Sequence, residues 1–496
     1  KTPDPWVGAD KRKGRTWEQR AEGQPFFAVY NFTISHESKI RNNIEPENII
    51  HDPAKARVPA YHPDTPEVRK DWAQYYDRIT MMDAECGAVL ADLEKQGLAD
   101  DTIVLYWGDH GSGMPRNKRW PYNSGLHVPM MIHVPEKWQK LAPSDYSAGG
   151  TSDRMVGFVD LAPTMLSLAG IEPKEWMQGH AFAGEHQASA PQYSYGFRGR
   201  MDERYDLVRT VMDQRYVYIR QYMPHRIYGQ YIQYMFQTTT TQQWHDLYHA
   251  GKLNEAQSHF WREKPAEELY DLHEDPDEVN NLAASDEHQE VLVRMRKAHQ
   301  DWEKEIRDVG FLPEAEIHSR SEGSTPYEMG HDPAKYDFDA IFAAADLASR
   351  KQPKDIPAIV ELLKSEDSAV RYWGATGLLI HKEAGVEAGR KALREALDDS
   401  SASVAIVASE ALGRFGKPRD LKAAQETLLK HSNQITGNVF EAILATNAID
   451  YLDDKMADRK EEISAIPTQW EKGKGPDRVS NYVSGVIGKV QADLAK

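Results

Sequence analysis

The stretch "TIVLYWGDHGSGMPRNKRWPYNSGLHVPMMIHVP", residues 102–135, decides the fold of the first part of the chain. It opens with an apolar run, rich in β-branched and aromatic residues, that is typical of a strand buried on both faces. The run ends in Gly-Asp-His-Gly, and a second apolar run starts at Val128. Because ligand sites of open α/β sheets lie at the carboxyl ends of strands, we expect Asp109 and His110 at such a site.

The flanking sequence continues the alternation of strand and helix. "PFFAVYNFTI", residues 25–34, predicts another buried strand, and the apolar spacing over 71–98 predicts a helix. "VDLAPTMLSLAG", residues 159–170, predicts a short helix that ends at a glycine. Strands separated by helices indicate an α/β domain with a mostly parallel sheet, which we place over residues 1–190.

The remaining chain divides into three further parts. Residues 191–312 contain a hairpin pattern around Asp213-Gln214 and predict a smaller antiparallel subdomain. Residues 313–345 are rich in Pro, Gly, Ser, His and Asp and are interpreted as a linker. In residues 346–496, "SAVRYWGATGLL" aligns with "ASVAIVASEALG", which predicts an all-α, HEAT-like repeat module. The alternative is a small helical bundle with coincidental similarity.

Composition limits the classes of function. The chain has 496 residues and a net charge of −17, so a nucleic-acid partner is not expected. No apolar run is long enough for a membrane span. The one cysteine, Cys86, excludes an intrachain disulfide. An anionic ligand needs local basic residues that outweigh the overall charge.

The 102–135 stretch resembles the second metal-ligand segment of type I sulfatases, the formylglycine-dependent members of the alkaline phosphatase superfamily. The resemblance implies an alkaline-phosphatase-like fold, a Ca²⁺ ion held in part by Asp109 and His110, and a sulfate contact from Lys118. Arg116 and Arg119 compete with Lys118 for that contact. His110 stands where the family more often has asparagine, which leaves the metal ligation open because calcium prefers oxygen. Without the resemblance, a turn cap at Asp109 and a surface position for His110 explain the Asp-His pair better than a metal site does, and loop charges explain the basic residues.

A second match supplies a histidine. "QPFFAVYNFTISHES", residues 24–38, is similar to the sulfatase strand that leads to a histidine contacting the sulfate ester, and the matching residue is His36. Protonated histidine can bind a sulfo group or protonate a leaving atom, although a lone histidine is more often structural. "KPAEELYDLHEDPDEVNNLA", residues 264–283, matches the C-terminal signature of the family and is assigned to packing.

The sequence departs from the family at the nucleophile. Sulfatases carry Cys or Ser in Cys/Ser-x-Pro-x-Arg, but Cys86 lies in "ECGAV" without the proline or arginine. We interpret Cys86 as a packing residue and expect the formylglycine on a residue absent from this chain. The 496 residues are therefore expected to be the larger, C-terminal part of a secreted or periplasmic protein, inactive alone.

The expected activity is hydrolysis of a sulfuric ester or sulfamate in a sulfated polysaccharide. Arg198 and Arg200 are weaker candidates for sugar contacts, with surface salt bridges as the alternative. Two other functions remain open: a phosphohydrolase of the alkaline phosphatase superfamily, and a non-catalytic glycan-binding or scaffold protein. The helical repeat is expected to fix a homo-oligomer or to shape one wall of a cleft for a long polyanion.

Overall fold

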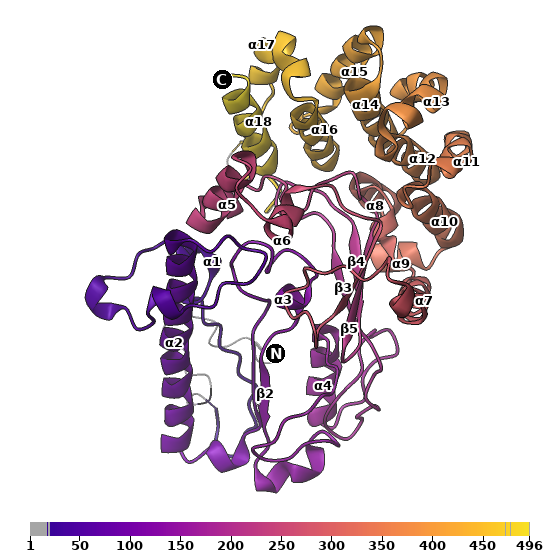
Figure 1. Cartoon of the computed structure of the whole chain (residues 1–496). Coiled ribbons are helices and arrows are strands. Elements are labelled where there is room, and N and C mark those ends of the chain that lie inside the picture. The colour runs from indigo at the N-terminus through magenta and orange to yellow at the C-terminus, as the bar shows by residue number, and fades with distance from the viewer. Residues whose placement is uncertain (1–16, 18–19, 472, 477, 496) are drawn as a thin grey trace.

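The computed structural model describes residue 17 and residues 20–471, 473–476 and 478–495 (Figure 1). Helices α10 to α18 form an arc over one end of the molecule, above a four-stranded sheet, and the long helix α2 lies to one side below them (Figure 1). No helix among these residues is long and apolar enough to cross a lipid bilayer.

The first part of the chain is a long helix beside a two-stranded sheet. Helix α2 begins with proline at its first position, and the side chain of Thr65 caps it by accepting a hydrogen bond from the backbone of Val68. The helix expected over residues 71–98 is therefore confirmed, with an earlier start. The elements of this part are α1 (Glu37–Ile40), α2 (Pro66–Lys95), β1 (Val104–Trp107), α3 (Asn123–Leu126), β2 (Met130–His133) and α4 (Leu161–Leu168).

The prediction of a mostly parallel sheet is wrong for the described residues. Strands β1 and β2 pair antiparallel, with Trp107 opposite Met130. A parallel pair is usually joined by a crossover helix that packs on the sheet, whereas the connection here contains one short helix, the four-residue α3. Residues 25–34, expected as a strand, have no ladder partner among the described residues and are not a strand.

The predicted antiparallel subdomain is confirmed. Its strands follow the order β3-β4-β5-β6, and Asp213 closes the predicted hairpin by accepting hydrogen bonds from the backbone of Arg215 and Tyr216. Strand β4 is buried along its whole length, and α7 packs against it. The elements are β3 (Ser194–Arg198), β4 (Val208–Met212), β5 (Tyr216–Gln221), α5 (Thr239–His249), α6 (Glu255–Ser258), β6 (Glu267–Asp271) and α7 (Gln289–Ile306).

The linker assigned to residues 313–345 is wrong, because this segment is helical and packed. It contains α8 (Glu314–Arg320), α9 (Pro326–Gly330) and the start of α10 (Phe338–Ser349). Polar residues of this segment act as helix caps: Thr325 and Glu328 form a capping box at the start of α9, and Asp337 accepts a hydrogen bond from the backbone of Ala340 at the start of α10. Met329 and Tyr336 of this segment are fully buried, whereas Tyr327 is exposed.

The helical repeat is confirmed. Helices α12, α14 and α16 pack side by side, and the aligned residues Leu378 and Leu412 are both fully buried. Gly377 allows close helix packing, since a Cβ there would lie 2.7 Å from the side chain of Ile359. The remaining helices are α11 (Ile356–Leu362), α12 (Ser368–Ile380), α13 (Lys382–Glu395), α14 (Ala402–Phe415), α15 (Pro418–His431), α16 (Val439–Leu452), α17 (Lys460–Ser464) and α18 (Tyr482–Asp493).

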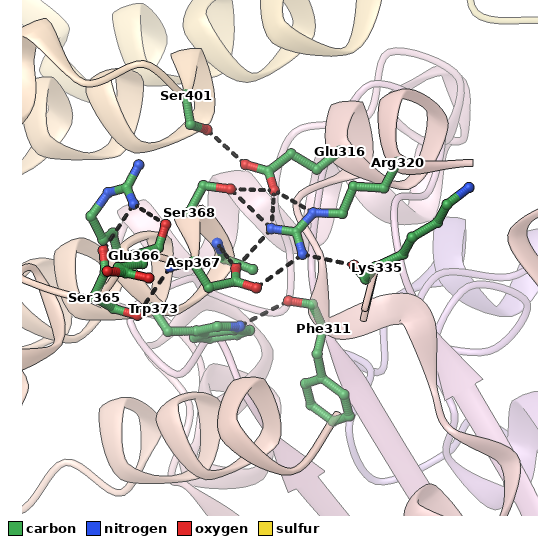
Figure 2. A network of polar contacts seen from close by, with 12 residues as sticks. Phe311, Glu316, Arg320, Lys335, Ser365, Glu366, Asp367, Ser368, Trp373 and Ser401 are labelled. Carbon is green, nitrogen blue, oxygen red and sulfur yellow. Dashed lines mark hydrogen bonds and ion pairs between the residues drawn. The ribbon is translucent and has the colours of Figure 1, made fainter. Parts of the chain in front are cut away.

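The repeat shares its hydrophobic core with the antiparallel subdomain. One cluster joins Tyr222 at the end of β5 to Phe311 and to Trp373 of α12, and the Trp373 indole donates a hydrogen bond of 2.9 Å to the Phe311 carbonyl. Figure 2 shows the polar side of this junction, where Glu316 and Arg320 of α8 bond the starts of α12 and α14. Residues 346–496 are therefore not an independently packed body.

Candidate functional site

His36 lies directly before helix α1 and serves as its N-cap. Its Nδ1 accepts a hydrogen bond of 3.3 Å from the backbone N–H of Ser38 and lies 2.9 Å from the Ser38 hydroxyl. Since Nδ1 accepts from the backbone, the neutral ring carries its proton on Nε2. The ring is thus oriented by its own helix and keeps one N–H for a ligand.

A buried carboxylate beside His36 gathers three cationic side chains. Glu37 is 1% exposed, and its Oε1 accepts hydrogen bonds from Arg119 at 3.0 Å and from Arg41 at 3.4 Å. Lys118 Nζ lies 3.6 Å from Oε2 of Glu37, which is beyond ordinary hydrogen-bond distance. Asp202, which also binds Arg119, brings the count to two carboxylates against three cations, so the cluster keeps a positive charge that attracts an anion although the whole chain is acidic.

Residues from separate sequence motifs affect the pKa of His36. Burial, and next the charge of Lys118, lower the pKa of His36 below its usual range, with His110 and Arg41 adding to this effect. The neighbouring Glu37 acts in the opposite direction. Lys118 and His110 are therefore close enough to His36 to affect its pKa.

Asp109 and His110 follow strand β1 and offer two ligand groups. The Asp109 carboxylate is exposed, and its Oδ2 lies 3.6 Å from Nε2 of His110. His110 Nδ1 is 2.7 Å from the Gly111 carbonyl, to which it donates, and this leaves the lone pair on Nε2. Among the described residues no group of three Asp, Glu, His or Cys side chains could hold a metal ion. Calcium takes six to eight oxygen ligands, so these two side chains do not form a calcium site by themselves.

Tight backbone packing fixes the loop that carries Lys118. A Cβ on Gly113 would lie 2.7 Å from the Cα of Glu37, so only glycine permits this approach. The backbone N–H of Lys118 donates to the Ser112 carbonyl at 3.1 Å, and Asn117 accepts a hydrogen bond of 2.8 Å from Tyr61. These contacts hold the loop against the start of α1.

Two of the predicted arginine contacts are wrong, because both side chains are buried in the protein. Arg116 lies between the rings of Tyr61 and Tyr122 and donates to two backbone carbonyls. Arg198 is 2% exposed, with its guanidinium over Trp120 and 3.6 Å from Asp206. Neither side chain can reach a bound sugar.

The other two predicted arginines have protein partners. Arg119 is buried and binds Glu37 and Asp202. It therefore fixes the position of Glu37 and is not free to bind a substrate. Arg200 forms a two-point ion pair with Glu314 at 2.8 and 2.9 Å and lines a cavity of about 40 Å³ between the antiparallel subdomain and the helical repeat. Lys118 remains the cation that the site offers to an anion.

Sequence reasoning missed the residues that support this site. Glu37 follows His36 directly, and an acid next to the histidine was the signal that could have identified it. Tyr234, whose ring lies 6.4 Å from the His36 ring and 4.0 Å from the Arg41 guanidinium, carries no such signal. Its contact with His36 comes only from the tertiary fold.

Two families match different parts of the chain. Residues 12–171 match the sulfatase family, and residues 356–443 match HEAT repeats. The two matches confirm the predicted resemblance to sulfatases and the predicted HEAT-like repeat that follows it in the chain.

Curated relatives are sulfatases. An "Ulvan-active sulfatase" from Formosa agariphila is 37% identical over 64% of this chain and 58% of its own length. The human "N-sulphoglucosamine sulphohydrolase" is 25% identical over 52% of each chain. This chain thus spans about half the length of the curated relatives it matches.

Solved structures match only loosely. One, determined with its substrate D-glucosamine-2-N,6-O-disulfate, is 20% identical with a TM-score of 0.35 and covers 49% of this chain and 43% of its own. The phosphonate monoester hydrolase of Agrobacterium radiobacter is 18% identical with a TM-score of 0.33, over 49% and 43% of the two chains. At these scores neither structure identifies the reaction.

Proposed function

We propose that this chain, in which a segment similar to sulfatases is followed by HEAT repeats, supplies the sulfate-binding part of a hydrolase that acts on sulfated carbohydrate. The reaction releases sulfate from a sulfuric ester or a sulfamate. The observation that supports this most strongly is the position of Lys118, held 3.6 Å from a buried carboxylate and within interaction range of His36.

The contacts of each side chain at the site indicate its role in the proposed reaction. Lys118 binds the sulfo group, because its ammonium makes no hydrogen bond to Glu37 at 3.6 Å and can turn toward an anion. As a neutral ring, His36 donates a hydrogen bond from Nε2 to a sulfo oxygen; as an imidazolium, it transfers that proton to the departing oxygen or nitrogen and returns to the neutral ring. Arg41 and Arg119 hold Glu37 in place from the protein side. No step in this division needs a residue from the helical repeat.

The family implies a calcium ion and a formylglycine. Asp109 and His110 are the residues of this chain that would hold such an ion, together with ligands that the described residues do not provide. When bound, a divalent cation polarises the sulfo oxygens. Formylglycine would come from a residue outside the 496 residues, and Cys86, half-buried on α2, is not that residue.

The proposed substrate class is sulfated glycan. The curated relatives are named as an ulvan-active sulfatase and as a sulphohydrolase of N-sulphoglucosamine, a sulfated sugar. A polymer of this kind is too large to enter a cell, so we propose that the protein is secreted or periplasmic. The alternative is a phosphohydrolase of the alkaline phosphatase superfamily, which would release phosphate in preference to sulfate.

The test is release of inorganic sulfate by the protein expressed from its complete gene. We expect release from sulfated oligosaccharides, with little phosphate released from the matching phosphate esters. His36→Ala and Lys118→Ala should each abolish it, whereas Lys39→Ala, which removes a lysine of α1 outside the cluster, should retain it. Equal activity in the Lys118→Ala protein, or preference for the phosphate ester, would contradict the proposal.

A further inference from the structure

A tight turn connects the candidate site to the helical repeat. Met201 and Arg204 pair across the turn through two backbone hydrogen bonds of 2.8 and 3.1 Å. Asp202, at the tip, has a φ of 49°, a left-handed conformation that aspartate tolerates better than most residues. Its carboxylate accepts a hydrogen bond of 2.9 Å from Nε of Arg119. The turn thus contacts the buried arginine that holds Glu37.

Helix α16 of the repeat binds the other side of this turn. Asn447 donates to the carbonyl of Glu203 at 2.8 Å and accepts from Arg204 at 2.6 Å. Asp450, one helical turn further on, accepts from Arg204 at 2.7 Å. Both side chains lie on one face of α16 because residues three apart are neighbours on a helix. Two side chains of the helical repeat, Asn447 and Asp450, therefore form hydrogen bonds with the turn.

These contacts are buried and fully paired. Arg204 is 1% exposed, and its third contact is a hydrogen bond of 2.6 Å to the Tyr231 carbonyl. Lys489 of α18 binds the second oxygen of Asp450 at 2.8 Å. Removing one partner of a buried charged pair leaves the other charge uncompensated, so α16 contributes to the position of the turn, together with the hydrogen bonds from Arg200 to the Asp202 carbonyl and from Gln233 to Glu203.

We propose that Asn447 and Asp450 are positioning residues for the sulfate-binding site, which they reach through the turn at 201–204, Asp202, Arg119 and Glu37. This inference rests on the proposed function, since it assigns the helical repeat a part in holding Lys118 and His36. Asn447 and Asp450 fix the turn, Asp202 then fixes Arg119, and Arg119 neutralises enough of Glu37 to keep Lys118 available for an anion. The repeat touches no substrate in this arrangement.

The test uses the 496-residue chain and two readouts. The first is the NMR signal of the Arg119 Nε–H, which reports its hydrogen bond to Asp202 without any ligand. The second is the affinity for inorganic sulfate. In Asn447→Ala and Asp450→Asn proteins we expect the Arg119 Nε–H to exchange with solvent about tenfold faster and sulfate to bind about tenfold more weakly, a loss typical of one charge-assisted hydrogen bond.

Two further variants make the test specific. Asp202→Asn should reproduce both effects, and adding Asn447→Ala to it should cause no further loss. Asp346→Asn is the control, because Asp346 of α10 forms a comparable ion pair of 3.0 Å with Arg220 but does not touch the turn. It should lower the melting temperature and leave both readouts unchanged.

The outcomes separate the two proposals. Unchanged Arg119 exchange in the Asn447→Ala and Asp450→Asn proteins, or an equal change in Asp346→Asn, overturns the positioning role. If the parent chain binds no sulfate while Arg119 exchange responds as expected, the proposed function fails, and α16 still positions Arg119.

Discussion

Lys118 Nζ lies 3.6 Å from Oε2 of Glu37, the residue that follows His36 in the chain. This spacing joins two sequence motifs that are far apart, since one precedes helix α1 and the other follows strand β1. Arg119, adjacent to Lys118, binds the same carboxylate at 3.0 Å. Neighbouring residues of one loop thus divide their tasks: Arg119 satisfies Glu37, and Lys118 stays available for an anion.

Sulfate binding should depend on pH through His36. Burial and the charge of Lys118 lower the pKa of His36, so the ring becomes protonated only below its usual range near 6.5. Because a protonated ring attracts an anion, affinity for inorganic sulfate should increase as the pH falls through that pKa. Calorimetric titrations from pH 8 to 5 measure this. His36→Gln should flatten the dependence, and His51→Gln, which removes a half-buried histidine beside Thr80, should not.

Glu278 should make the folded chain less stable at high pH. Burial, opposed in part by Arg116, raises the pKa of Glu278 to about 7 from 4.5. Folding therefore favours the protonated acid. Its contribution to stability is complete below pH 4.5 and is lost as the pH rises through 7. At about 1.4 kcal/mol per pKa unit, Glu278→Gln should stabilise the chain by roughly 3 kcal/mol above pH 8 and leave it unchanged near pH 4.

Denaturant unfolding at several pH values checks this prediction. The matched control is Glu274→Gln, which neutralises an exposed glutamate of the same loop. A Glu278→Gln protein that is stabilised equally at pH 4 and pH 8 would show that the carboxyl group does not titrate as described.

The ion pair between Arg226 and Glu410 should hold the helical repeat to the antiparallel subdomain. Two hydrogen bonds of 2.5 and 2.7 Å join the two side chains, and both are buried. Glu410→Ala leaves the Arg226 charge buried without a partner, which costs about 3–5 kcal/mol. Thermal unfolding should show this loss. Glu395→Ala, which breaks an exposed ion pair with Lys391, should change stability by less than about 1 kcal/mol.

Cutting the chain after residue 345 should prevent the remainder from folding. The cut removes Trp373 and the other repeat side chains that share one core with Tyr222 and Phe311, and it leaves Arg220 and Arg226 without their acidic partners. We expect loss of near-ultraviolet circular dichroism and no cooperative unfolding transition. A cooperative transition like that of the parent chain would show that the two parts fold independently.

The sequence was sufficient to predict those elements whose structure depends on residues close together in the chain. The spacing of apolar residues located α2 and the repeat helices, and the Gly-Asp-His-Gly motif located the end of β1. Strand direction was predicted wrongly because pairing depends on partners distant in sequence. The segment 313–345 was misread because residues such as Asp337, which caps α10, are also common in linkers. Arg116 and Arg198 looked like anion contacts because a sequence does not show which cations are buried.

The most direct test of the site is a crystal structure of the chain soaked with inorganic sulfate and, separately, with a sulfated monosaccharide. We expect the sulfo group between Lys118 and His36, with Nζ of Lys118 and Nε2 of His36 each about 3 Å from a sulfo oxygen and with Arg119 still on Glu37. The same soak of a Lys118→Ala crystal should show no sulfo group there. A sulfo group bound elsewhere in the parent crystal, or one that remains at His36 when Lys118 is removed, would contradict the assignment.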